Sequence, residues 1–136
     1  MPDSQRYPRL RRRDIPRHAK VVLVRGDNDD PEIDRTQAQD FIERYPRWGR
    51  FGLSAYYAED EAGVDDLAFD LLERFEQLLV YPLKSLLDAG FEVAPTFRPP
   101  HVTIAFTDLD RGLRLLAGTE HERRPNPYHG IERGTP

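Results

Sequence analysis

The 136-residue chain contains no cysteine, which excludes disulfide bonds and thiolate metal sites. It also has no run of 18 apolar residues, which excludes a membrane-spanning helix. The N-terminus is basic, but no apolar segment follows it, so we expect no secretion signal and a cytoplasmic location. The length leaves room for one core, and stability must come from its packing.

Negative charge is concentrated in the middle of the chain, although the net charge is only −4. Residues 1–20 carry seven basic and two acidic side chains, whereas residues 21–110 carry eight basic and 19 acidic ones. The basic run Arg11, Arg12 and Arg13 therefore contacts either phosphate groups of a partner or the acidic surface of its own chain. Broad binding of duplex DNA is not expected from so acidic a body.

The apolar pattern predicts a single α+β domain over residues 18–118. A basic arm rich in proline and arginine precedes it at 1–17, and an irregular tail follows it at 119–136. We expect a mixed sheet of about four strands with three to four helices on one face. The strands are predicted at residues 19–25, 51–57, 91–97 and from 101, and the helices at 34–45, 64–79, directly after Pro82, and at 109–117.

The segment that most suggests chemistry is the strand after Pro99-Pro100, which reads His-Val-Thr-Ile-Ala-Phe from residue 101. Alternation along a strand places His101 and Thr103 on one face of the sheet. A histidine exchanges protons near neutral pH, and Thr103 and the nearby Arg98 are candidates to bind a phosphoryl group. The structural alternative is a histidine that hydrogen-bonds to backbone at the start of a strand.

The triplet from His101 to Thr103 resembles the His-x-Thr motif of 2H phosphoesterases, and the match covers about ten residues. Those enzymes use two such motifs on facing strands, with one histidine as base and one as acid, to open cyclic phosphates or RNA ends. The resemblance implies a second histidine, for which His18 is the candidate. The triplet there ends in Lys20, so an ammonium group replaces the hydroxyl.

The function predicted from these residues is that of a small protein that binds or acts on a nucleotide or RNA phosphate, of the toxin or accessory-effector kind. His101 would carry the proton. Arg25, at the end of the first predicted strand, is a further candidate to bind phosphate. We predict no metal and no cofactor for this function.

A second resemblance is to ADP-ribosyltransferases, whose arginine, serine and Glu-x-Glu elements match, in order, Arg25, Ser54 and the pair Glu120 and Glu122. This resemblance implies NAD as substrate, with Arg25 on its phosphate and Glu122 activating the acceptor. The pair precedes a predicted tail rather than a core strand, which departs from the family pattern. The structural alternative is that Arg25 pairs with the acidic loop, Ser54 lies in a strand and the glutamates are solvated.

Two further features favour binding without catalysis. The loop from Asp27 to Asp34 is rich in carboxylates but lacks the ligand order of a calcium-binding EF-hand, so we interpret it as solvated or as a docking point for the arginines of the arm. Trp48 lies between arginines, as interface anchors and base-stacking platforms do, and the structural alternative is a tryptophan that fills the edge of the core. The alternative function is a protein-interaction module that docks through the arm and the Trp48 region onto a partner or a second copy.

Overall fold

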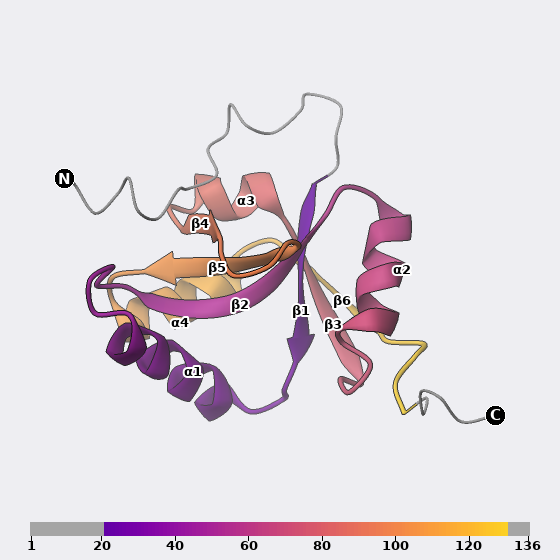
Figure 1. Ribbon diagram of the computed structural model, residues 1–136, viewed down its shortest axis with the longest axis horizontal. Helices are drawn as coiled ribbons and strands as arrows, with labels where there is room; N and C mark the ends of the chain where they lie inside the picture. Colours follow the sequence, from indigo (N-terminus) through magenta and orange to yellow (C-terminus); the bar gives the residue numbers. More distant parts are fainter. Residues whose placement is uncertain (1–20, 131–136) are drawn as a thin grey trace.

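The computed structural model describes residues 21–130, which form a six-stranded antiparallel sheet and four helices (Figure 1). The strands lie in the order β4-β5-β2-β1-β3-β6. The α+β class is confirmed, but the prediction of about four strands in a mixed sheet is wrong, because every neighbouring pair is antiparallel. The elements are β1 (Val22–Asp27), α1 (Pro31–Arg44), β2 (Phe51–Ala58), α2 (Glu61–Asp70), β3 (Gln77–Pro82), α3 (Leu83–Asp88), β4 (Glu92–Pro95), β5 (His101–Phe106), α4 (Leu109–Gly118) and β6 (Glu122–Pro125).

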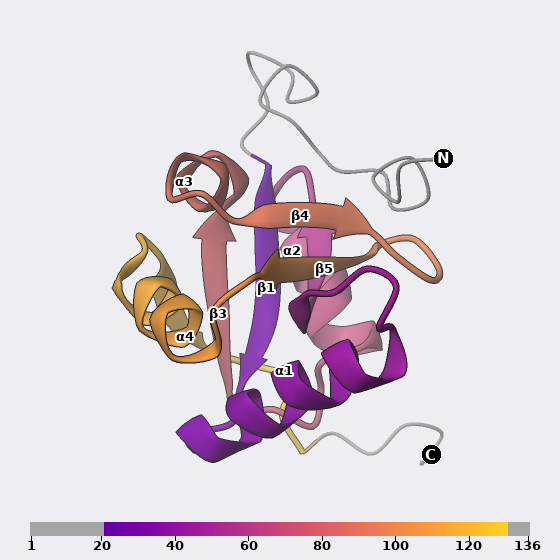
Figure 2. The same ribbon diagram turned by 90° about the vertical axis from the view of Figure 1, so that its left-hand side faces the viewer.

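Helices cover both faces of the sheet, not one face as the sequence predicts. On the first face, here the α3–α4 face, Leu23 and Ile104 are buried against Leu86 of α3. On the second, here the α2 face, Val24 is buried against Leu67 of α2. The sheet twists so strongly that β4 and β5 run across the direction of β1 and β3 (Figure 2). Each face of the sheet thus buries its own apolar cluster, and a third, smaller cluster lies around Trp48.

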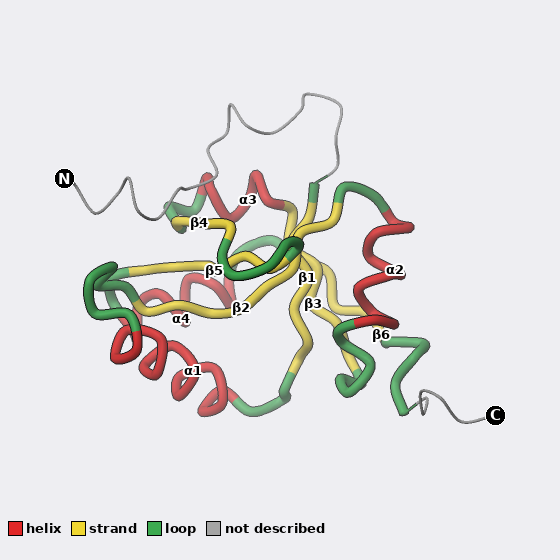
Figure 3. The backbone as a smooth tube through the Cα atoms, viewed as in Figure 1, coloured by secondary structure: helices red, strands yellow, loops and turns green. Residues whose placement is uncertain are grey.

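The prediction of one long helix over residues 64–79 is wrong. Helix α2 begins where the carboxylate of Asp60 accepts the N–H of Gly63 at 2.8 Å, and it ends at Asp70. A loop follows and leads into β3 (Figure 3). Leu78 and Leu79 continue the helical spacing of the sequence, but they lie in β3, where successive side chains point to opposite faces of the sheet.

The buried side chain of Asn126 holds the loop between α2 and β3 in place. Its amide nitrogen lies 3.4 Å from the carbonyl oxygen of Ala68, 2.9 Å from that of Leu72 and 3.1 Å from that of Phe75. Carbonyls at the end of a helix have no partner within the helix, and this amide supplies one. Together with β6, which pairs with β3, Asn126 makes residues predicted to be an irregular tail part of the domain.

We expect Asn126→Ala to lower the free energy of unfolding by about 2 kcal/mol, because at least two well-placed hydrogen bonds to buried carbonyls are lost. Urea denaturation measures the effect. The matched control is Asn28→Ala in a partly exposed loop, for which we expect a change of less than about 0.5 kcal/mol. Equal effects of the two substitutions would contradict the role of Asn126.

Helix α1 begins earlier than the sequence predicts. The side chain of Asp30 accepts the N–H of Glu32 at 3.0 Å, and Pro31 is the first helical residue. Asp34, which the pattern indicates as the cap, lies instead within the first turn and pairs with Arg25. The short helix after Pro82 and the last helix agree with prediction. Within residues 21–130, none of the helices has the length and apolar character needed to cross a bilayer.

Candidate functional site

A strip of four polar side chains lies on the α2 face of the sheet, along β2 and β5. It consists of Ser54, Tyr56, His101 and Thr103. The pairing of these strands sets Tyr56 opposite His101 and Ser54 opposite Thr103. Residues paired across a sheet share a face, so the prediction that His101 and Thr103 point to the same side is confirmed. Tyr56 packs against the core under α2 at one side of this strip. At the other side, the ring of Phe41 lies against the backbone of β2.

Thr96 connects the two residues that the sequence singles out. Its Oγ1 lies 2.9 Å from Nδ1 of His101 and 2.8 Å from Oγ1 of Thr103. The contact at Nδ1 orients the imidazole ring, and no described residue bonds Nε2. Among the described residues, Nε2 is therefore the ring nitrogen without a hydrogen bond. Thr96 lies in the connection between β4 and β5, five residues before His101, and nothing in the local pattern distinguishes it from any turn threonine.

Burial lowers the pKa of His101, and a hydrogen bond with the backbone of Thr96 partly opposes this effect. The imidazole is consequently neutral at pH 7, the form that accepts a proton. Thr103, by contrast, is fully buried and its hydroxyl contacts Thr96. Thr103 thus positions Thr96 and His101, rather than touching a phosphoryl group as the sequence suggests.

An exposed aromatic ring lies beside this histidine. The Phe97 side chain is 67% exposed, and its ring centroid lies 5.1 Å from that of His101 and 5.9 Å from that of Tyr45. The backbone of Phe97 has a φ of 58°, a conformation that costs free energy for a bulky residue. Hollows of about 320 and 210 Å³ adjoin this residue, one lined by His101 and the other by Tyr45 and Ser54. Phe97 thus lines both hollows.

Exposed arginines flank the aromatic pair. Arg44 ends α1 and Arg47 follows in the next turn, while Arg98 directly follows Phe97. The contact between the rings of Tyr45 and Phe97 brings these two segments together. Arg98, a predicted phosphate ligand, therefore lies in the same surface region as His101, and its backbone oxygen accepts the N–H of His101 at 2.9 Å.

Arg25 does not take part in this site. It lies on the α3–α4 face with only 4% of its surface exposed. Its Nη2 donates to Asp34 at 2.7 Å, and its Nε donates to the backbone oxygen of Ser54 at 3.3 Å. The expected contribution of Arg25 to phosphate binding beside His101 is therefore wrong.

The residues that resemble an ADP-ribosyltransferase site do not lie close to one another. The side chains of Ser54 and Glu122 lie on the α2 face, opposite to Arg25. Three strands away from Ser54, Glu122 forms an ion pair with Arg124 at 3.0 Å. Arginine, serine and glutamate thus lack the shared pocket that NAD would need.

Trp48 is not the surface anchor that its arginine neighbours suggest. Only 8% of its surface is exposed, and it packs with Ala94, Ala105 and Phe41 on the α2 face. Its ring meets that of Phe41 edge-on, with centroids 5.4 Å apart. Trp48 therefore packs beneath Phe41, whose ring in turn contacts that of Tyr45.

Five predicted site residues lie outside the described residues. They are His18 and Lys20 of the expected second motif, and Arg11, Arg12 and Arg13, the expected interface residues of the arm. The strand that follows them, β1, is separated from β5 by β2, and both β1 and β5 run antiparallel to β2. The two strands consequently begin at the same end of the sheet but are not adjacent, which departs from the facing strands of the phosphoesterase pattern.

The acidic loop after β1 is bound by an arginine that the sequence does not single out. Nη2 of Arg123 on β6 lies 2.9 Å from Asp27 and 2.6 Å from Asp29. Among residues 21–130, no cluster of three or more histidine, aspartate or glutamate side chains has the arrangement of a metal site. The loop carboxylates therefore hold β6 against the end of β1.

Comparison of the chain with protein-family models, curated proteins and solved structures found no match. The functional assignment therefore depends on the geometry around His101.

Proposed function

We propose that this protein binds a nucleotide or single-stranded RNA at the strip around His101, and that His101 accepts a proton during cleavage of the phosphodiester. The observation that supports this function is the contact of Thr96 with Nδ1 of a half-buried, neutral histidine, next to the exposed ring of Phe97. An oriented base beside a stacking surface is what a site for RNA requires.

The chemistry follows from the position of Nε2. A base stacks on Phe97 and the phosphate lies toward Arg98, which places the ribose near His101. Nε2 takes the proton of the 2′-hydroxyl, the 2′-oxygen attacks phosphorus, and the bond to the 5′-oxygen breaks. The products are a 2′,3′-cyclic phosphate and a 5′-hydroxyl, whose proton comes from an acid. In the two-histidine scheme that acid is His18.

Binding tests the stacking surface directly. We expect Phe97→Ala to weaken the binding of a fluorescent single-stranded oligoribonucleotide by about five- to a hundredfold, which corresponds to the loss of stacking with one base. The matched control is Phe69→Ala, which removes another exposed phenylalanine, on α2. Fluorescence anisotropy at fixed salt measures both, because affinity for phosphates varies steeply with salt. Failure of the unchanged protein to bind RNA or a nucleotide would refute the function.

A further inference from the structure

A hollow of about 720 Å³ lies near the N-terminal end of α2, and acidic side chains surround it. Its floor is apolar and is formed by Val22, Val64, Val80 and Pro82. Five carboxylates line it: Glu59, Asp60, Glu61, Glu120 and Glu122. Arg124 is the single lysine or arginine among the described residues that line it. A hollow lined by both apolar side chains and carboxylates suits a cation with a long aliphatic stem.

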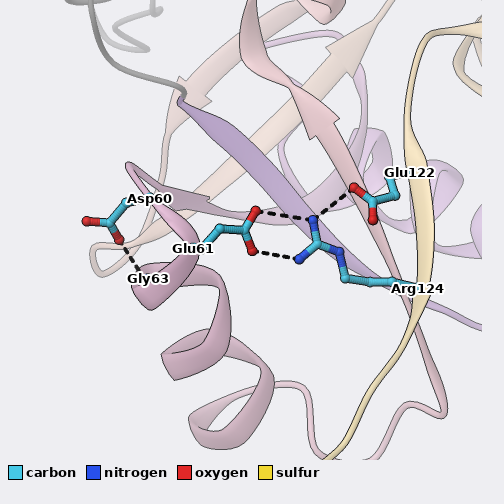
Figure 4. Close-up of polar contacts among 5 residues, drawn as sticks. All are labelled: Asp60, Glu61, Gly63, Glu122 and Arg124. Carbon is cyan, nitrogen blue, oxygen red and sulfur yellow. Dashed lines mark hydrogen bonds and ion pairs between the residues drawn. The ribbon is translucent and has the colours of Figure 1, made fainter.

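Arg124 balances only a small part of this negative charge. Its guanidinium lies between Glu61, at 2.8 Å, and Glu122, at 3.0 Å, as Figure 4 shows. One positive charge is thus shared by two carboxylates, and Nε of Arg124 is buried without a hydrogen-bond partner. The pair of glutamates keeps a net negative charge after this contact.

Two of the other three carboxylates accept hydrogen bonds from neutral donors. Asp60 accepts the backbone N–H of Gly63 at 2.8 Å, which Figure 4 also shows, and Glu120 accepts the hydroxyl of Ser85 at 2.7 Å. Neutral donors fix the direction of a carboxylate but leave its charge in place. The hollow, here the acidic hollow, therefore keeps an excess of negative charge among the described residues that line it.

The basic arm joins the domain at this hollow. Residues 1–20 lie outside the described part of the chain, which begins at Val21, and Val22 lines the hollow. Nine Cα–Cα steps lead from Arg13 to Val22, enough to span at most about 30 Å. A loop of this length closes at little entropic cost, and tethering gives the arm an effective concentration of about millimolar. Weak ion pairs then suffice for binding.

We propose that the segment Arg11-Arg12-Arg13 binds in the acidic hollow of its own chain. The guanidinium groups pair with Glu59 and Glu120, and the aliphatic stems cover the valines of the floor. The acidic loop at Asp27 is a poorer site, because Arg123 already binds it and because it lies at the far end of β1 from Val22.

The absence of cysteine makes a direct test possible in the full chain. In Leu10→Cys, a nitroxide label stands next to the three arginines and leaves all of them in place. We expect the label to abolish the amide NMR signals of Glu59 to Gly63 and of Glu120 to Glu122 at low salt. We expect those signals to return in 1 M salt, where the screening length falls to about 3 Å.

The matched variant is Leu10→Cys with Glu59→Gln and Glu120→Gln, which removes two charges that are not in the ion pair with Arg124. We expect most of the broadening to disappear, with the chemical shifts of the core unchanged. Broadening of residues 27–30 instead, or equal broadening in the matched variant, would overturn the proposal. So would broadening that appears only between labelled and isotope-enriched molecules in a mixed sample, because the occupant would then be the arm of a second copy.

Discussion

Substitution of His101 by glutamine is expected to slow RNA cleavage by about two to four orders of magnitude, the usual contribution of a positioned general base. Binding should change little, because the stacking surface at Phe97 and the arginines beside it remain. Glutamine retains a polar group beside Thr96 but has no basic nitrogen. A single-turnover assay with saturating protein separates the chemical step from binding.

The control is His129→Gln, an exposed histidine outside the strip, which should leave the rate unchanged. The thermal midpoint of each variant shows whether the fold survives. If His101→Gln loses activity only in proportion to a loss of folded protein, then the histidine is structural, as the alternative from the sequence holds. A variant that is folded, binds RNA and still cleaves at the original rate would exclude His101 as the base.

The pH dependence of the cleavage rate is a second test of the role of His101. Burial lowers the pKa of His101, so the neutral, proton-accepting form persists to lower pH than for a histidine in water. The rate should therefore fall as the pH is lowered, with a midpoint below the ordinary histidine value of about 6.5. A midpoint above that value would contradict the burial of the ring or its role as base.

Local alternation was enough to place His101 and Thr103 on one face, because strand geometry fixes the direction of successive side chains. The same local reasoning fails for Thr96, which reaches the histidine only because the chain turns back between β4 and β5. It fails again for Trp48, whose neighbours in sequence are charged while its neighbours in space are alanines and a phenylalanine. Contacts made across turns have no signature in a single sequence.

The predicted helix over residues 64–79 shows how non-local pairing overrides periodicity. Leucines 78 and 79 fit a helical face as well as a strand, and the sequence alone favours the longer regular pattern. In the structure, β3 has β1 on one side and β6 on the other, so backbone hydrogen bonds on both edges favour the strand. One partner, β6, comes from residues whose prolines and charges predict a tail, which is why the sheet has more strands than predicted.

Arg25 illustrates a residue whose chemistry is apparent from the sequence but whose role is not. An arginine at the end of a buried strand suggests an anion-binding site, and it does bind an anion, the carboxylate of Asp34. The pairing depends on helix α1 beginning at Pro31, so that its first turn faces β1. The ion pair therefore links β1 to α1 and serves the fold rather than a ligand beside His101.

Removal of Asp34 is accordingly expected to cost about 3–4 kcal/mol of stability, because it leaves the buried guanidinium of Arg25 without its counter-ion. The comparison is Asp110→Ala, which breaks the ion pair with Arg35. Both carboxylates lie in the first turn of a helix, so each substitution loses the same interaction with the helix dipole. They differ in exposure, 30% for the Asp34 side chain and 70% for that of Asp110. For Asp110→Ala we expect less than about 1 kcal/mol.

The double variant Arg25→Met with Asp34→Ala shows whether the loss of stability in Asp34→Ala arises from the unpaired charge of Arg25. A methionine fills the space of the arginine stem without a charge, so the double variant should be more stable than Asp34→Ala alone. Chemical denaturation of the single and double variants provides the full cycle. If the double variant is less stable than Asp34→Ala, then the contact of Arg25 with the backbone of Ser54 outweighs the cost of its unpaired buried charge, and the explanation of the loss by that charge is wrong.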